Sequence, residues 1–357
     1  MSKKPLILGI ESSCDETAAS LITENEEGFP VVLSNIVSSQ VEVHREFGGV
    51  VPELAARSHI EKIDWIVKKA IDESGRKIEE IDAVASTAGP GLIVCLSVGL
   101  SFGKAFATAM NKPFIAVNHL EGHALSPKLN TNLNYPYLLL LISGGHSQYL
   151  SVQNLGKYKR LGTTIDDALG EAFDKTAKLL GIEFPGGPQI EILAKKGDPE
   201  KYDLPKPIFS KGGCNLSFAG LKTAVLKISK TIESEQNKYD LAASFQKTIE
   251  EILYKKTKIA FTEFEKINEL NEKIFVVAGG VAANKKIRSM LINLCEENNY
   301  KSIFPPIEFC GDNAAMIAMV GLEKFKINQF NNLDYPAKPR WPLDEDAAFL
   351  KGAGVQL

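Results

Sequence analysis

Two of the five histidines in the chain stand four residues apart, at His119 and His123. On an α-helix this spacing places both imidazoles on one face, where they can bind the same metal ion. The same spacing also occurs on solvated helix surfaces and in hydrogen-bonded cores. The pair alone leaves these interpretations open, and a third ligand elsewhere in the chain would decide between them.

Two polar turns that follow apolar segments could also do chemistry. Residues 11–17, which include Glu11 and Asp15, separate the apolar runs 6–10 and 18–22. Residues 143–147, Ser-Gly-Gly-His-Ser, separate a second pair of apolar runs in the same way. Backbone N–H groups in such turns can contact phosphate, and carboxylates can hold a metal ion or water. An ordinary hairpin turn remains the alternative for both.

Glycine pairs and acidic residues mark further candidate segments. We expect a rigid turn at 185–188 and a strand, Gly-Gly loop and helix start over 273–285, where exposed backbone could lie against a nucleotide. Asp167, Glu171 and Asp174 have the spacing of one acidic helical face. Asp312 starts the last helix, and helix capping alone would explain an aspartate there.

These candidates depend on an alternation of strands and helices. The patterns predict strands over 31–37, 81–86 and 114–117, and helices over 52–73, 93–110, 164–180 and 239–266. The strand 114–117 ends where the two histidines begin. Open α/β sheets bind ligands outside the carboxyl ends of their strands, so this position favours a functional role.

The strand-turn-strand unit occurs twice, once at the N-terminus and again from residue 137. A chain of 357 residues is also long enough for two domains. The repeat predicts a duplicated fold of two lobes, with a nucleotide or phosphate between the halves.

Composition excludes several classes of protein. Hydrophobic residues make up 44% and charged residues 24%, as in globular proteins, and no apolar run reaches the ~18 residues of a membrane span. The apolar segment near the N-terminus is too short for a secretory signal, so we expect a cytoplasmic protein without membrane contact. The five scattered cysteines suggest reduced thiols. At a net charge of −3, nucleic-acid binding would need a local basic face, such as the lysine-rich stretch 195–211, or a partner subunit.

Ten segments, taken in order, resemble the TsaD family of tRNA N6-adenosine threonylcarbamoyltransferases. They are residues 11–17, 44–59, 88–92, 119–123, 143–146, 166–180, 185–188, 217–222, 278–284 and 310–318. The resemblance covers nearly the whole chain from Leu6 to Leu343. Neither a G-x-G-x-x-G fingerprint nor a Walker A loop is present, which disfavours those two nucleotide-binding families.

The resemblance implies an α/β fold of the actin/Hsp70-like (ASKHA) type, with two RNase-H-like lobes and the active site in the cleft between them. The expected N-terminal lobe is 1–130, completed by a helix at about 310–330. The C-terminal lobe is then 131–305, followed by a tail at 331–357.

The family also implies site residues. His119, His123 and Asp312 would hold one divalent metal, Fe²⁺ or else Zn²⁺. The threonylcarbamoyl-adenylate would be bound by Leu141, Ile142, Ser143, Gly144, Gly145, Asp174, Gly187, Glu191 and Asn284. The N6 amine of an adenine would attack the carbamoyl carbon and AMP would leave. From their place in the polar turn 11–17, we hypothesise that Glu11 or Asp15 accepts the amine proton.

By this resemblance the chain forms t6A at adenosine 37 of tRNAs that read codons beginning with A. Its partners would be tRNA, a TsaB paralogue and the TsaE ATPase. The alternative is a metal-dependent glycoprotein endopeptidase, but zincins have H-E-x-x-H and here Leu120 follows the first histidine. A non-catalytic nucleotide-binding scaffold is a third hypothesis, against which the intact metal ligands argue.

Overall fold

The computed structural model describes residues 4–348, and the chain divides into two compact units. Unit 1 contains the residues up to Leu133 together with Pro305–Glu345. Unit 2 contains Asn134–Phe304 and, within the described part, residues 346–348. Part of the predicted tail, residues 331–345, thus belongs to unit 1, and residues 349–357 lie outside the described chain.

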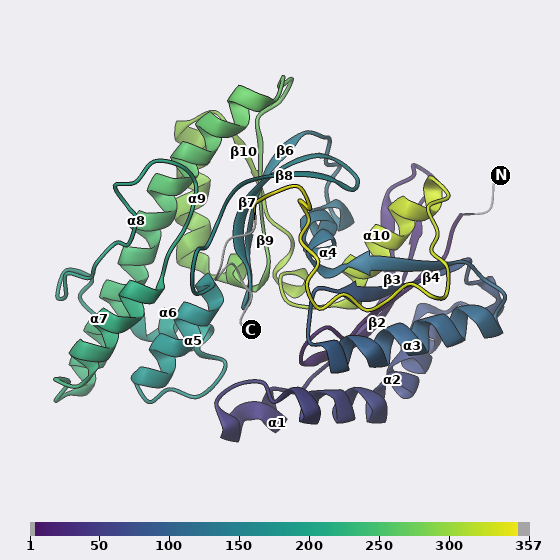
Figure 1. The fold of residues 1–357 in the computed structure, drawn as a ribbon, viewed down its shortest axis with the longest axis horizontal. Coiled ribbons are helices and arrows are strands. Elements are labelled where there is room, and N and C mark those ends of the chain that lie inside the picture. The colour runs from purple at the N-terminus through teal and green to yellow at the C-terminus, as the bar shows by residue number, and fades with distance from the viewer. Residues whose placement is uncertain (1–3, 349–357) are drawn as a thin grey trace. The chain divides into compact units, whose positions relative to one another are not determined.

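The sheet of unit 1 has the strand order β3-β2-β1-β4-β5 (Figure 1). The first three strands are antiparallel neighbours, whereas β4 and β5 run parallel to β1. The strands are β1 (Ile7–Glu11), β2 (Glu16–Glu24), β3 (Pro30–Ser39), β4 (Ala83–Gly89) and β5 (Phe114–Asn118). The carboxyl ends of β1, β4 and β5 therefore lie at one edge, which is where Glu11 and the two histidines stand.

Helices cover both faces of this sheet (Figure 1). Leu8 and Ile10 of β1 belong to the apolar cluster formed with α2 (Pro52–Ser74) and α3 (Ile93–Ala109). Alternate residues face α10 (Ala314–Lys326), where a Cβ on Gly9 would lie 2.4 Å from the Ala314 carbonyl oxygen. Only glycine permits this approach, so Gly9 sets how closely the helix after Asp312 packs on the sheet.

The remaining helices of unit 1 are short. They are α1 (Val41–His44), α4 (His119–Leu125) and the 3₁₀ segments η1 (Arg45–Phe47), η2 (Ile78–Glu80), η3 (Ser126–Leu129) and η5 (Ile307–Phe309). The longer α2 begins with Pro52 at its first position and ends before Gly75, which has a left-handed φ of 67°. Among the described residues, no helix combines the length and apolar character that crossing a membrane requires.

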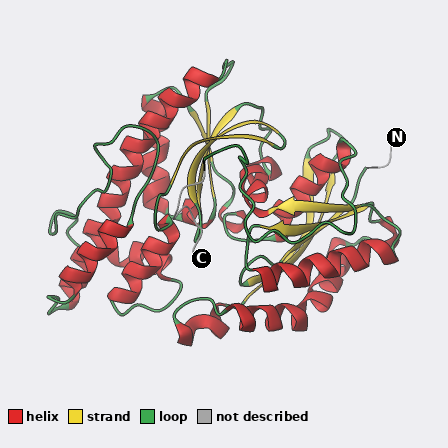
Figure 2. Cartoon of the chain, in the orientation of Figure 1, coloured by secondary structure: helices red, strands yellow, loops and turns green. Residues whose placement is uncertain are grey.

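Unit 2 repeats the topology, with strand order β10-β9-β6-β7-β8 (Figure 1). Figure 2 shows the strands of this sheet in yellow and the helices in red. Here β6, β7 and β8 are antiparallel, whereas β9 and β10 run parallel to β6. The strands are β6 (Tyr137–Ile142), β7 (Ser147–Asn154), β8 (Lys157–Thr163), β9 (Ile274–Ala278) and β10 (Lys301–Ile303). The predicted strand-turn-strand repeat is thus present, and each copy begins a sheet of the same order.

The helices of unit 2 are α5 (Leu169–Leu179), α6 (Gly186–Ala194), α7 (Ala219–Ser229), α8 (Glu235–Ile267), η4 (Gly280–Ala283) and α9 (Lys285–Glu297). All six residues of the central strand β6 are buried, as expected for an apolar run with strands on both sides. The long helix α8 buries one side over most of its length.

Several local expectations were wrong. The rigid turn expected at 185–188 is instead the start of α6 at Gly186, although a close approach of backbone is present there, since a Cβ on Gly186 would lie 2.2 Å from Ala177 Cβ. Asp167 precedes α5, so only Glu171 and Asp174 of the expected acidic face lie on that helix. Lys175 forms ion pairs with both Asp167 and Glu171. The strands β8 and β10 and the helix α7 were not predicted, since short or mixed segments carry little periodic signal.

Candidate functional site

The two histidines lie in α4, which begins directly after the edge strand β5. Asn118 ends the strand and caps the helix, because its side-chain oxygen accepts a hydrogen bond from the Leu120 N–H at 2.9 Å. Both histidines are buried, and their ring centroids are 4.8 Å apart. The sharp change from strand to helix therefore presents both rings at the carboxyl edge of the sheet.

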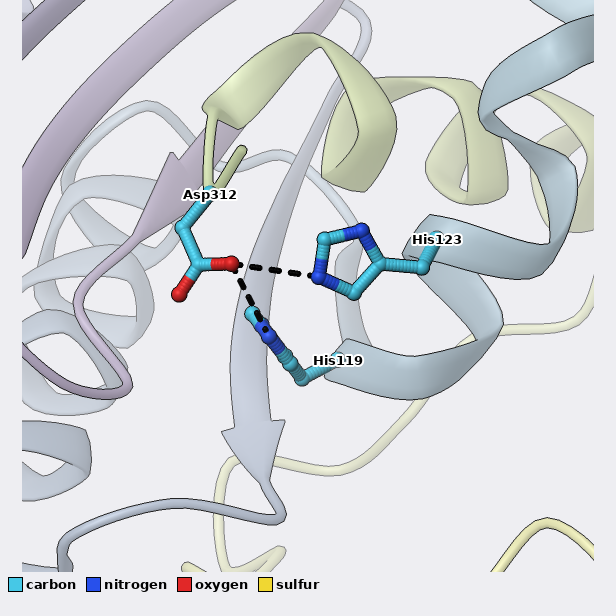
Figure 3. A group of neighbouring side chains, drawn as sticks. All are labelled: His119, His123 and Asp312. Atoms are coloured by element: carbon cyan, nitrogen blue, oxygen red, sulfur yellow. Dashed lines mark hydrogen bonds and ion pairs between the residues drawn. The ribbon is translucent and has the colours of Figure 1, made fainter. Parts of the chain in front are cut away.

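Asp312 joins this pair from the far end of the unit's sequence (Figure 3). Its Oδ1 lies 3.4 Å from His119 Nε2 and 3.1 Å from His123 Nε2. The helix that follows is capped by Asn313, whose side chain accepts from the Met316 N–H. The expectation that Asp312 is the helix cap was therefore wrong, and its carboxylate is directed at the two imidazoles instead.

The three side chains have the geometry of a metal site. One ligand atom from each of His119, His123 and Asp312 lies within 4.8 Å of the others. Two imidazole nitrogens and one carboxylate oxygen match the facial triad of non-haem iron and also suit catalytic zinc. Three protein ligands would leave coordination positions open for a substrate, so the residues fit a catalytic divalent metal.

The electrostatics of the triad are those of tightly coupled charges. Burial alone would raise the pKa of Asp312, but the charges and hydrogen bonds of His119 and His123 hold it well below the ordinary value. Burial likewise opposes charging of His119, and the carboxylates of Asp312 and Glu11 raise its pKa well above normal. The site therefore concentrates negative charge that a cation can neutralise.

Glu11 supports the triad from behind His119. Its Oε2 lies 3.0 Å from His119 Nδ1, on the ring nitrogen opposite to the one near Asp312. Ser13 N–H donates to Oε1 at 2.5 Å and Thr87 Oγ1 donates to Oε2 at 2.6 Å, so both carboxylate oxygens are engaged. A carboxylate in this position accepts a hydrogen bond from the Nδ1 proton, so Nε2 is the nitrogen from which a metal would displace the other proton.

Ser13 and Thr87 were not identified from the sequence. The Ser13 hydroxyl also lies 3.2 Å from His119 Nδ1. Its place in the same polar turn as Glu11 was a usable signal. The sequence held no such signal for Thr87, because this residue reaches Glu11 only through the pairing of β1 with β4, in which Ile10 lies opposite Ser86.

Asp15, the second candidate proton acceptor, lies in the turn between β1 and β2 and is 9% exposed. It is not one of the residues that surround His119 Nδ1. Burial, followed by the charge of Asp15, raises the pKa of Glu16 well above its usual range. Asp15 and Glu11 are thus both buried carboxylates, Asp15 the less completely so.

In unit 2, the expected adenylate-binding turn joins β6 to β7. The Ser143 N–H donates to the His146 carbonyl at 2.8 Å, so this N–H is engaged within the turn. Gly144 and Gly145 are exposed, and open space surrounds the position of a Cβ at each. Leu141 and Ile142 are fully buried in the strand, which leaves only their backbone to contact a ligand.

Two glycines bring neighbouring backbone against this turn. A Cβ on Gly170 would lie 2.7 Å from the Ser143 carbonyl oxygen, and one on Gly279 would lie 2.5 Å from the Ile142 carbonyl oxygen. Gly279 also has a φ of +94°. The start of α5 and the loop after β9 therefore meet at the carboxyl end of β6.

The other expected substrate residues connect the helices around this turn. Asp174 Oδ1 accepts from the Gly186 N–H at 2.8 Å, and Glu191 Oε1 accepts from the Lys285 N–H at 3.0 Å. Asn284 caps α9 and donates to Gln246 Oε1 at 3.0 Å. Gly187 has room for a Cβ, with the nearest atom 3.9 Å away.

The lysine-rich stretch 195–211 is partly neutralised. Lys206 forms an ion pair with Glu251. The local basic patch expected there is therefore weaker than the sequence indicates.

Comparison with known proteins identifies the family of the chain. The family model described as "TsaD: tRNA N6-adenosine threonylcarbamoyltransferase" matches residues 31–319. A Pelagibacter ubique protein named tRNA N6-adenosine threonylcarbamoyltransferase is 80% identical over 357 residues, which is 100% of both chains. A protein of the same name from Rickettsia conorii is 53% identical over 342 residues, covering 95% of this chain and 98% of the relative.

Solved structures support the fold alone. HypF from T. kodakarensis superposes with a TM-score of 0.62 at 13% identity, over 94% of this chain and 50% of that one. A full-length HypF in a phosphate- and nucleotide-bound form gives 0.58 at 13% identity, over 93% and 48% of the two chains. The fold is of the ASKHA type, and the chain belongs to the TsaD family of tRNA N6-adenosine threonylcarbamoyltransferases.

Proposed function

We propose that the chain transfers the threonylcarbamoyl group from threonylcarbamoyl-AMP to N6 of adenosine 37, in tRNAs that read codons beginning with A. Its family consists of tRNA-modifying transferases, and the chain is an enzyme of that class. The observation that carries the proposal is the full-length 80% identity to a protein of this name. The donor, the tRNA position and the site residues are the parts that we propose.

In this proposal the adenylate is bound by unit 2. The exposed N–H groups of Gly144 and Gly145 bind its phosphate, since a glycine turn offers backbone donors without side chains in the way. Asp174, Gly187, Glu191 and Asn284 stand on the helices that pack around the same strand end. Because Glu191 and Asn284 already bond to protein groups, they act on the nucleotide mainly by fixing the start of α9.

His119, His123 and Asp312 hold a divalent metal, iron in preference to zinc. When bound, such an ion supplies Lewis-acid stabilisation of charge on the phosphate or carbonyl oxygens. Glu11 accepts a hydrogen bond from the Nδ1 proton of His119 for this purpose, so that Nε2 is the nitrogen that would bind the metal once it gives up its own proton. The role of Glu11 in this proposal is therefore to position a ligand, although the sequence suggested it as a proton acceptor.

The transfer forms a bond between N6 of the adenine and the carbamoyl carbon, and it breaks the bond from that carbon to the phosphate oxygen. AMP leaves as the anion, and N6 loses a proton. We assign the proton to Asp15, because both oxygens of Glu11 accept hydrogen bonds from the protein.

The peptidase alternative is not favoured. The relatives carry the name of the transferase, and the only acidic residue between the two histidines, Glu121, forms a buried ion pair with Lys324. A general base for peptide hydrolysis must reach a metal-bound water, and a carboxylate held by a lysine on the opposite side of the helix does not.

We further propose tRNA, a TsaB paralogue and the TsaE ATPase as partners, and the cytoplasm as the location, since the substrate is tRNA. The net charge of −3 supports a tRNA platform shared with a second subunit.

The proposal is tested by incubating the protein with threonylcarbamoyl-AMP, the partner subunits and a tRNA with an NNU anticodon, and by measuring t6A. We expect t6A with the wild type and none with His119→Ala. A tRNA with guanosine at position 37 is the control for the nucleoside. Casein hydrolysis without t6A formation would favour the peptidase, and loss of cellular t6A on deletion should be rescued by the wild type alone.

A further inference from the structure

A buried ion pair lies on the side of α4 that faces away from the metal ligands. Glu121 follows His119 by two residues, which places it about 200° around the helix from that histidine. Its Oε2 lies 2.8 Å from Lys324 Nζ, and the two side chains are only 4% and 9% exposed. Lys324 also donates to the Ala116 carbonyl in β5 at 3.5 Å. The pair therefore lies between the ligand helix and the core of unit 1.

The two partners come from the two elements that carry the ligands. Glu121 stands between His119 and His123, and Lys324 stands in α10, which begins two residues after Asp312. The ion pair thus joins the helix of both imidazoles to the helix that follows the carboxylate.

The same two helices touch at a second point. A Cβ on Gly122 would lie 3.0 Å from Ile317 Cδ1 and 3.1 Å from Met316 Cγ. Contact near the start of α10 and an ion pair near its end fix both the separation and the rotation of α4 against α10. Two separate contacts resist rotation, which one contact alone would allow.

Stability alone does not account for the pair. Desolvation of two buried charges commonly cancels most of their attraction, so a well-packed apolar pair would serve the core as well. We infer that Glu121 and Lys324 are positioning residues that hold α4 and α10 in the register in which two imidazoles and one carboxylate bind a single ion. This inference depends on the proposed metal site but not on the identity of the substrate.

The test measures metal affinity in the full-length protein, with Co²⁺ as a spectroscopic probe and Zn²⁺ in competition. We compare the wild type with Lys324→Met and with Glu121→Gln, which removes the charge while conserving volume. We expect Kd to rise roughly 10- to 100-fold in both, the range seen when groups behind metal ligands are lost. The visible Co²⁺ spectrum should also change, which a purely structural role would not predict.

Lys128→Met is the matched control. Lys128 forms an ion pair at 2.7 Å with Glu323 of α10, and the two side chains are 14% and 16% exposed. Lys128 lies beyond the end of α4. This variant should lose thermal stability and keep the wild-type Kd and spectrum. Lys324→Arg, which retains the charge, should recover part of the affinity.

Wild-type affinity and spectrum in a folded Glu121→Gln protein would overturn the inference, whether or not Lys324→Met folds. A wild-type protein that binds neither metal would refute the proposed metal site itself, and the inference with it. Transfer activity does not enter the readout, so failure of the proposed reaction remains a separate result.

Discussion

Replacing Glu11 with glutamine tests how His119 is prepared for a metal, because the substitution keeps the volume of the side chain and removes its charge. Three donors converge on the carboxylate: Ser13 N–H at 2.5 Å, Thr87 Oγ1 at 2.6 Å and His119 Nδ1 at 3.0 Å. Glutamine has only one acceptor oxygen. If that oxygen accepts the hydrogen bond from the Ser13 N–H, the amide NH₂ group faces Nδ1 of His119.

An NH₂ group facing Nδ1 reverses the tautomer of His119. Nδ1 must then accept, so the proton moves to Nε2, which is the atom 3.4 Å from Asp312 and the atom required for metal binding. We expect metal affinity to fall roughly 10- to 100-fold, which corresponds to about 1.4–2.7 kcal/mol. Transfer activity should fall with metal occupancy and recover in part at high metal concentration.

The assay is a competition titration of the metal-free protein with Co²⁺ or Zn²⁺ against a chelator of known affinity. Asp15→Asn is the control, because it removes a carboxylate of the same turn that is not hydrogen-bonded to His119, and it should leave Kd within about twofold of the wild type. If Glu11→Gln binds metal as tightly as the wild type but fails in transfer, the positioning role is refuted and Glu11 returns as the proton acceptor.

Three further predictions concern stability. Burial lowers the pKa of His59, so as the pH falls the unfolded chain takes up the proton before the folded one. Below pH ~6.5, His59 therefore lowers the free energy of unfolding by at most about 1.4 kcal/mol per pH unit. The stability that His59→Gln loses relative to the wild type should shrink from pH 7.5 to 5.5 in urea titrations. Asn118→Asp keeps the cap of α4 but loses the 3.0 Å donation to the Trp341 carbonyl, which should cost about 1–3 kcal/mol in the same assay. Gly89→Ala should cost at least about 2–3 kcal/mol and lower the yield of folded protein, because its Cβ would lie 1.8 Å from the Lys338 carbonyl oxygen at a φ of +145°.

Each of these has its own control. His44 is buried near His59 and bonds to the same glutamine, Gln40. If His59→Gln leaves the pH dependence of the unfolding free energy unchanged, His59 is not its source. Asn118→Ala should be worse than Asn118→Asp, since it also removes the cap. Gly28→Ala tests backbone strain alone, because Gly28 has a φ of +83° and nothing within 4 Å. A similar loss at Gly28 and Gly89 would contradict the proposed clash.

Much of the fold could be predicted because it follows from the periodic spacing of apolar residues within single segments. The runs that became β1, β5, β6 and β9 are continuous and apolar, and the helices α2, α3 and α8 have clear starts or long amphipathic patterns. Segments 157–163 and 301–303 mix polar and apolar residues, so they form strands only because a neighbouring strand offers its backbone.

The candidate site was predicted in part. The histidine spacing gave a pair of imidazoles on one helix, and the resemblance to the TsaD family supplied Asp312 and the residues of unit 2. The residue pattern alone left a helix cap at Asp312 as an open alternative, because sequence cannot show that the next residue, Asn313, takes that role. It also placed Glu11 among the proton acceptors, since two of its three donors, Thr87 and His119, come from segments far along the chain.

By itself, the sequence determined which residue types stand at turns and strand ends, since spacing along one segment is a local property. It also determined the family, through segments that keep their order over almost the whole chain. Only the tertiary structure decided what those residues contact. Asp312 reaches His119 because Gly9 lets α10 pack directly on β1, and Glu121 is held by a lysine rather than free to act as a base. Such contacts depend on how helices and strands pack, and no short-range pattern records them.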